Sequence, residues 1–121
     1  MKILICSKYK FHDRWDNLKI EFEKNGHECI TPADIDLSLH GKLDNDMSKD
    51  EYLLSTKRFF KLIEESDLLY VANFNGEFGN STMCEIGYAA ALGKKIIAFE
   101  KLDAEPSLSH FIKRIAKPEE V

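Results

Sequence analysis

The chain is poor in the residues that cross-link a fold or hold a metal. Its 121 residues include three cysteines at scattered positions, so a disulfide framework is excluded as the basis of the fold. We expect Cys6, Cys29 and Cys84 to be buried as small apolar side chains. The four histidines form no pair at helical ligand spacing and no cluster with cysteine. We therefore expect no metal site and no other cofactor.

Long hydrophobic runs and charge of one sign are also missing. No stretch approaches the roughly 18 consecutive apolar residues that span a bilayer. The opening segment becomes charged at Lys8, too early for the apolar region of a secretory leader. The net charge is −4 with no long basic run, so the electrostatic footprint of a nucleic-acid binder is absent. These features predict a cytoplasmic protein that binds neither membranes nor nucleic acid polymers.

What is present indicates one globular domain over residues 1–121, with 44% hydrophobic and 31% charged residues. Apolar runs predict strands at 2–6, 27–31, 67–72 and 95–99. Helical patterns lie between and after them, at 13–25, 48–65, 82–92 and 107–116. This alternation predicts an α/β three-layer sandwich of the flavodoxin or Rossmann-like kind. Its parallel sheet would have four strands, or five, in the order 2-1-3-4.

The second predicted helix has a clear start. Ser48 and Glu51 match the capping-box pattern, in which each side chain bonds the backbone N–H of the other residue. The expected packed side of this helix consists of Leu53, Leu54, Phe60 and Ile63. In residues 33–47, which precede this helix, the apolar residues show no clear helical or strand periodicity. A connection of this length is either a functional lid or a disordered segment, and the sequence favours neither.

The polar loop after the third predicted strand, together with the helix behind it, carries the candidate site. Open α/β folds bind ligands at the edge where parallel strands end, and a helix N-terminus suits an anion or a sugar. Glu85 lies in the first turn of a helix expected to start at Thr82. We expect the helix dipole to lower its pKa and keep it ionised, as a glycosyl nucleophile requires. The structural alternative is a capping box between Thr82 and Glu85. The candidate ligand-binding residues here are Asn73, Asn75, Gly76, Gly79, Asn80, Ser81 and Thr82.

The loop after the first strand reaches the same edge of the sheet. Ser7 and Tyr9 are candidates there for contact with a sugar or a phosphate. Plain exposure in a loop is the alternative for both residues.

The third strand and the third helix also carry a family pattern. It consists of Ser-Asp-Leu-Leu-Tyr-Val at 66–71 and Gly-x-Ser-Thr-x-x-Glu-Ile-Gly-Tyr-Ala-x-Ala-x-Gly-Lys-Lys-Ile at 79–96. This pattern resembles the nucleoside 2-deoxyribosyltransferase family, whose superfamily includes deoxynucleoside 5′-monophosphate N-glycosidases. The family's nucleophilic glutamate falls on Glu85. The resemblance implies cleavage or transfer of the N-glycosidic bond of a nucleoside or nucleoside 5′-monophosphate, by a homo-oligomer.

The chain departs from the family pattern at three positions. Phe59 and Gly79 stand where the family has aspartates, and Leu4 replaces a tyrosine of the first strand. The general acid that would protonate the leaving base is therefore unassigned. The candidates are Glu77 in the loop after the third strand, and Asp34 and Asp36 in the long connection.

Two other functions remain open. One is a non-catalytic module that binds or senses a nucleotide or nucleotide sugar on the same fold, which the missing aspartates favour. The other is a phosphoribohydrolase resembling the lysine-decarboxylase-like family, which has a similar Gly-x-Gly-Thr-x-x-Glu turn. This chain lacks the Pro-Gly-Gly sequence that leads into that turn.

Overall fold

A computed structural model describes residues 1–35, 48–102 and 105–121. The strands are β1 (Lys2–Cys6), β2 (Glu28–Ile30), β3 (Leu68–Val71), β4 (Lys95–Ala98) and β5 (Arg114–Ile115). The helices are α1 (Trp15–Lys24), α2 (Lys49–Glu65), α3 (Asn80–Ala91) and α4 (Pro106–Ser109). Short 3-10 turns are η1 (Tyr9–Arg14), η2 (Pro32–Asp34), η4 (Phe74–Gly76) and η5 (Pro118–Glu120). Among the residues that the structure describes, none of the helices combines the length and the hydrophobicity of a membrane span.

The five strands form one sheet in the order β2-β1-β3-β4-β5, and every pair is parallel. The predicted fold class is confirmed, with the order 2-1-3-4 extended by a fifth strand. Cys6 at the end of β1 lies opposite Val71 at the end of β3, and Val71 lies opposite Ala98 of β4. The carboxyl ends of these three central strands are therefore level. The loops that follow them open at one edge of the sheet.

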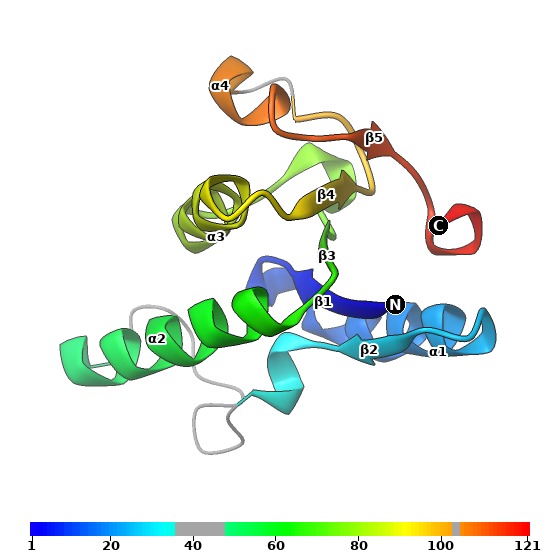
Figure 1. Ribbon diagram of the computed structural model, residues 1–121. Helices are drawn as coiled ribbons and strands as arrows, with labels where there is room; N and C mark the ends of the chain where they lie inside the picture. The colour runs from blue at the N-terminus through cyan, green and yellow to red at the C-terminus, as the bar shows by residue number, and fades with distance from the viewer. Residues whose placement is uncertain (36–47, 103–104) are drawn as a thin grey trace.

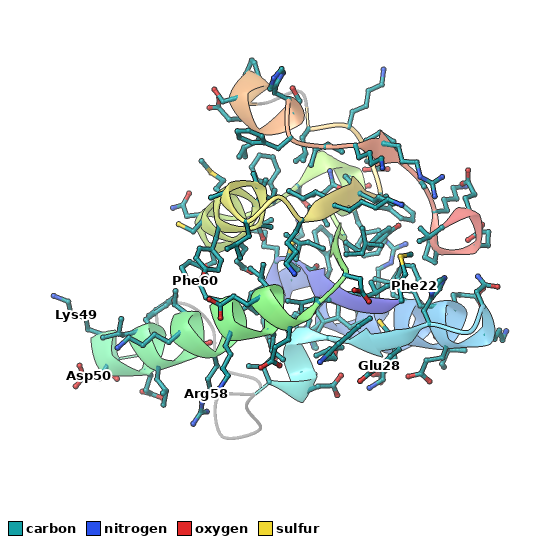
Figure 2. The ribbon with its side chains drawn as sticks, in the orientation of Figure 1. Phe22, Glu28, Lys49, Asp50, Arg58 and Phe60 are labelled. Carbon is teal, nitrogen blue, oxygen red and sulfur yellow. The ribbon has the colours of Figure 1, made fainter. Side chains whose placement is uncertain are left out.

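Each face of the sheet is covered by helices, because alternate side chains of a strand point to opposite faces. Ile3 and Ile5 belong to the core under α1, and Leu4 and Cys6 belong to the core under α2 and α3. Figure 1 shows α2 and α3 on one side of the strands, with α1 and the C-terminal turn on the other. In Figure 2, Phe60 of α2 lies toward α3, where its ring stacks on Tyr88 at a centroid distance of 4.2 Å. Glu85 therefore belongs to the α2–α3 side.

The predicted start of α2 is confirmed, and α3 ends in a second local motif. Glu51 N donates to Ser48 Oγ and Ser48 N donates to Glu51 Oε1, both at 3.1 Å, so the capping box opens α2. At the end of α3, Gly93 has a φ of +71°, which favours glycine. The N–H groups of Gly93 and Lys94 bond the carbonyls of Ala90 and Ala89 there, as in a Schellman motif.

The packed side predicted for α2 is partly wrong. Ile63 is buried and Phe60 is half-buried, but Leu53 and Leu54 are 55% and 46% exposed. Figure 1 shows the reason, because the first turns of α2 project past the strands. The unpatterned stretch 33–47 is described only as far as residue 35, so its interpretation as a lid or a disordered segment lies outside the described residues.

The last predicted helix, over residues 107–116, is wrong as well. The helix α4 ends at Ser109, and β5 follows and pairs with β4. Lys113 N donates to Ile96 O at 2.8 Å and Ala116 N donates to Ala98 O at 3.0 Å. These bonds satisfy the open edge of β4, and a helix through the same residues would leave that edge unpaired.

Candidate functional site

The loops after β1 and β3 meet at the carboxyl edge of the sheet. Ser7 Oγ donates to the carbonyl of Ala72 at 3.1 Å, which ties the end of β1 to the end of β3. A β-carbon placed on Gly79 would lie 3.8 Å from Lys8 Cγ, so the first loop also runs beside the start of α3. Among the predicted ligand-binding residues, the structure thus brings Ser7 and Gly79 to the same edge.

Tyr9 lies one turn further along, in η1. Its half-buried ring stacks on His12, with 4.5 Å between the ring centroids and an angle of 7° between the planes. The Trp15 ring meets the Tyr9 ring edge to face, with 6.0 Å between the centroids and 80° between the planes. Tyr9 is therefore part of a small aromatic group and is not merely a loop residue in solvent.

The loop between β3 and α3 is held in shape by the end of β4. Asn73 is buried, its Nδ2 donates to the carbonyl of Glu100 at 2.8 Å, and its Oδ1 accepts from the N–H of Glu100 at 2.9 Å. The Glu100 carboxylate accepts from Gly76 N. Asn75 and Gly76 have φ values of +60° and +74°, so the chain turns sharply there. The side-chain amide of Asn73 thus positions the loop, whereas Asn75 is exposed.

The helix α3 begins two residues earlier than predicted. Gly79 is its N-cap residue, with φ −102° and ψ 178°, so Asn80, Ser81 and Thr82 form its first turn. Asn80 and Ser81 are exposed, and Thr82 is buried. A capping box between Thr82 and Glu85 is therefore wrong, because both residues lie inside the helix. Within the described ranges no side chain caps this helix, so its first N–H groups remain available to an acceptor.

Glu85 lies in the second turn of α3, and its carboxyl is partly withdrawn from water. The residue is half-buried, but its Oε2 atom is buried and has no hydrogen-bond partner among the residues that the structure describes. Burial raises the pKa of Glu85 from 4.5 to about 8. The expectation that the helix dipole would lower this pKa is wrong. The dipole acts mainly within the first turn, whereas loss of water disfavours the charged form directly.

The thiol of Cys6 lies in the electrostatic neighbourhood of Glu85. Burial raises the pKa of Cys6, and the negative charge of Glu85 raises it further. The sequence predicted burial of Cys6 and Cys29 correctly but gave no reason to place Cys6 near the site. The position of Cys6 as the last residue of β1 is the signal that could have done so. Cys84, expected to be buried, is exposed, because its side of α3 faces away from the sheet.

The candidate acids that the structure describes are held as ion pairs. Lys10 Nζ lies 2.8 Å and 3.0 Å from the two carboxylate oxygens of Glu77, and this hydrogen bonding lowers the pKa of Glu77. Burial pushes the pKa of Asp34 upward, but hydrogen bonds from Thr31 and Lys19 outweigh it and the pKa is lowered. Asp36 lies outside the described residues. Neither described carboxyl holds a proton near neutral pH in this arrangement.

One cavity of about 190 Å³ lies on the α1 side of the sheet, away from Glu85. Arg14, Leu18, Phe74, Phe99 and Pro118 contribute to its wall. The Arg14 guanidinium lies 3.4 Å above the centroid of the Phe74 ring. Over the described ranges, no group of three or more histidine, cysteine or acidic side chains is placed to hold a metal ion.

No protein-family model matches the chain, and no curated protein matches it. Solved structures do. A CMP N-glycosidase of Clostridium botulinum, BcmB, is 24% identical with a TM-score of 0.60, over 99% of this chain and 92% of that one. A 2-deoxyribosyltransferase of Bacillus psychrosaccharolyticus is 13% identical with a TM-score of 0.71, over 99% and 89%. A conserved protein of Enterococcus faecalis V583 is 15% identical with a TM-score of 0.59, over 99% and 92%.

At these identities the likeness establishes the fold and leaves the activity to be argued from the site. The fold that the sequence resemblance implies is therefore confirmed: the chain shares it with this N-glycosidase and this deoxyribosyltransferase.

Proposed function

We propose that this protein cleaves or transfers the N-glycosidic bond of a nucleoside or nucleoside 5′-monophosphate, with Glu85 as the nucleophile. The observation that carries the proposal is the Glu85 carboxyl, which has a buried, unpartnered oxygen on the helix that starts at the carboxyl edge of the sheet. A buried acceptor without a partner is costly unless a bound group satisfies it. The fold shared with an N-glycosidase and a deoxyribosyltransferase supports the same reaction class.

The reaction we propose is a double displacement. Glu85 attacks C1′ of the sugar, the bond from C1′ to the base nitrogen breaks, and the base leaves with a proton from an acid. Water or a second base then attacks C1′ and releases Glu85, with overall retention of configuration. The exposed first turn of α3, with Asn80 and Ser81, would bind a sugar hydroxyl or a phosphate.

The raised pKa of Glu85 sets a condition on this reaction. At pH 7 a carboxyl with a pKa of about 8 is mostly protonated, and only the ionised form is a nucleophile. The positive charge that develops on the sugar as the base leaves stabilises the ionised form and thereby favours attack. A buried carboxylate responds more strongly to that charge than one surrounded by water.

Base release tests the proposal directly. The protein is incubated with a panel of nucleosides and their 5′-monophosphates, and free base is measured by chromatography. We expect release from at least one compound by wild-type protein and loss of about three orders of magnitude in the Glu85→Gln variant, which keeps the shape of the side chain but not the nucleophile. Equal release by both proteins, or none by wild type, would contradict the proposal.

A second function is favoured by a specific observation, the state of the three described carboxyls. Glu85 is mostly protonated at neutral pH, and Glu77 and Asp34 are engaged in ion pairs. That arrangement suits a module that binds a nucleotide without turning it over. Its signature would be a ligand-induced rise in melting temperature that persists in Glu85→Gln, with no base released by either protein.

A further inference from the structure

The Lys10–Glu77 ion pair joins the two loops that border the proposed site. Lys10 belongs to η1, after β1, and Glu77 lies between η4 and α3, after β3. The lysine ammonium contacts both oxygens of the carboxylate, at 2.8 Å and 3.0 Å. Because β1 and β3 are neighbours in the sheet, the pair lies across the gap between their loops.

The two loops are held together without this pair. Phe11, next to Lys10, is buried and meets the buried ring of Phe74 edge to face, with 5.2 Å between the centroids. The bond from Ser7 Oγ to the Ala72 carbonyl joins the same two segments. The side chains of Lys10 and Glu77 are 57% and 37% exposed, and exposed pairs contribute little to stability. The pair is therefore free to serve binding.

Positive charge gathers where the pair lies. The charge of Lys8 also lowers the pKa of Glu77, and the Lys8 side chain runs beside Gly79, the N-cap residue of α3. The Lys10 ammonium thus lies at Glu77, two residues before the N-cap of α3, and the Lys8 side chain passes the N-cap itself. Glu77 supplies the carboxylate that neutralises Lys10 in the ligand-free protein.

We infer that Glu77 occupies the place of an anionic ligand group. The 5′-phosphate of a nucleoside monophosphate displaces it from Lys10, so Lys10 and Glu77 determine specificity for phosphorylated over unphosphorylated sugars. A phosphate carries more charge than a carboxylate and offers more acceptor oxygens, so it competes effectively for a lysine. Glu77 in turn discriminates against neutral ligands. A neutral ligand that separates Glu77 from Lys10 offers the lysine no anionic group in place of the carboxylate. The inference deepens the proposed function and rests on it for the identity of the sugar.

The test is calorimetric binding to the full chain with probes that carry no base. These are ribose 5-phosphate and 2-deoxyribose 5-phosphate, the two free sugars and inorganic phosphate. We expect at least one sugar phosphate to bind about tenfold more tightly than its free sugar. In Lys10→Met the sugar-phosphate affinity should fall about tenfold, and in Glu77→Gln it should rise several-fold. The free-sugar affinity should not fall in Lys10→Met, because a neutral sugar forms no ion pair with the lysine and no longer has to break the Lys10–Glu77 bond.

Lys24→Met is the matched control, because Lys24 forms an exposed ion pair with Glu21 on α1, at 3.4 Å, away from both loops. This variant should bind all probes as wild type does. Melting temperatures within about 2 °C of wild type would show that the variants are folded.

Three results would overturn the inference: no sugar phosphate binds, Lys10→Met and Glu77→Gln leave sugar-phosphate affinity unchanged, or inorganic phosphate binds as tightly as a sugar phosphate. Failure of the proposed function looks different. In that case Lys10 and Glu77 still control sugar-phosphate binding, but no base is released from any monophosphate.

Discussion

At the residue scale, the carboxyl groups of Glu85, Glu77 and Asp34 differ in pKa because their surroundings differ. Glu85 has lost water and gained no partner among the described residues, so its pKa is raised. Glu77 and Asp34 each accept hydrogen bonds from a lysine, so their pKa values are lowered. Different pKa values in carboxyls near one site indicate different roles. The group that holds a proton at neutral pH is the one that the sequence had predicted to be ionised.

The pH dependence of activity follows from this separation. If Glu85 is the nucleophile, its ionised fraction rises about tenfold per pH unit below its pKa and levels off above it. We expect kcat/KM for base release to rise between pH 6 and 8 and to approach a plateau above pH 8, near the pKa of about 8. A kcat/KM that stays flat or falls between pH 6 and 8 would contradict the nucleophile role, because it would show that the reaction does not need the ionised form of Glu85.

Stability should depend on pH with the opposite sign. Between the unfolded pKa of 4.5 and the folded pKa of about 8, the folded protein holds a proton that the unfolded chain has lost. The free energy of unfolding therefore falls with rising pH, by up to about 1.4 kcal/mol per pH unit from this group. Glu85→Gln does not titrate, so its melting temperature should exceed that of wild type increasingly from pH 5 to 8. A difference that is constant with pH would contradict the raised pKa.

At the element scale, the loop that leads into α3 depends on a partner from the segment that follows β4. Asn73 closes two hydrogen bonds with the backbone of Glu100, and the Glu100 carboxylate fixes the turn at Gly76. The rigidity of this loop sets where α3 starts and hence where Glu85 lies. The sequence shows an asparagine in a polar loop and predicts a ligand contact. The actual partner is 27 residues away and could not be read from local spacing.

Loss of the Asn73–Glu100 hydrogen bonds, which clamp the loop before α3, should lower the free energy of unfolding. Asn73→Ala removes the side chain that bonds Glu100 N and O and leaves these two part-buried backbone groups without that partner. We expect the free energy of unfolding to fall by about 2–3 kcal/mol, measured by urea denaturation. Asn80→Ala, at an exposed position in the first turn of α3, should change it by less than about 0.5 kcal/mol. Equal effects of the two substitutions would argue against the clamp.

The local signals for elements were reliable where the interacting groups are close in sequence. The Ser48–Glu51 box involves residues within one turn, so its pattern alone predicts it. The start of α3 was misplaced because Gly79, with an extended backbone and no polar side chain, gives no capping signal. The burial of the Glu85 carboxyl depends on tertiary packing, and no local pattern reports it.

At the scale of the whole molecule, the C-terminal segment closes the sheet. The hydroxyl of buried Tyr70 in β3 donates a hydrogen bond to the carbonyl of Ala116, just after β5, at 2.7 Å. The alternation of apolar runs with helical patterns predicts the parallel sheet and its strand order, because each central strand is a continuous apolar run. It failed for β5, whose residues Arg114 and Ile115 are exposed and whose strand character comes from pairing with β4.

Removal of the Tyr70 hydroxyl should weaken the attachment of β5 to β4. Tyr70→Phe leaves the Ala116 carbonyl without its partner and should lower the free energy of unfolding by about 1–2 kcal/mol. The amides of Lys113 and Ala116, which bond to β4, should exchange faster with deuterium than in wild type, whereas those of β1 should change less. Uniform acceleration across both strands would show that the bond has no local role in holding β5.

The central claim, that Glu85 forms a bond to the sugar, is tested most directly by trapping that bond. Wild-type protein is mixed with a nucleoside or nucleoside 5′-monophosphate from which it releases the base. The mixture is quenched in acid, the protein is digested, and the peptides are analysed by mass spectrometry. The account predicts a mass increase equal to the glycosyl group on the peptide that contains Glu85, absent from Glu85→Gln. Release of base with inversion of configuration at C1′, or a glycosyl group on another side chain, would contradict it.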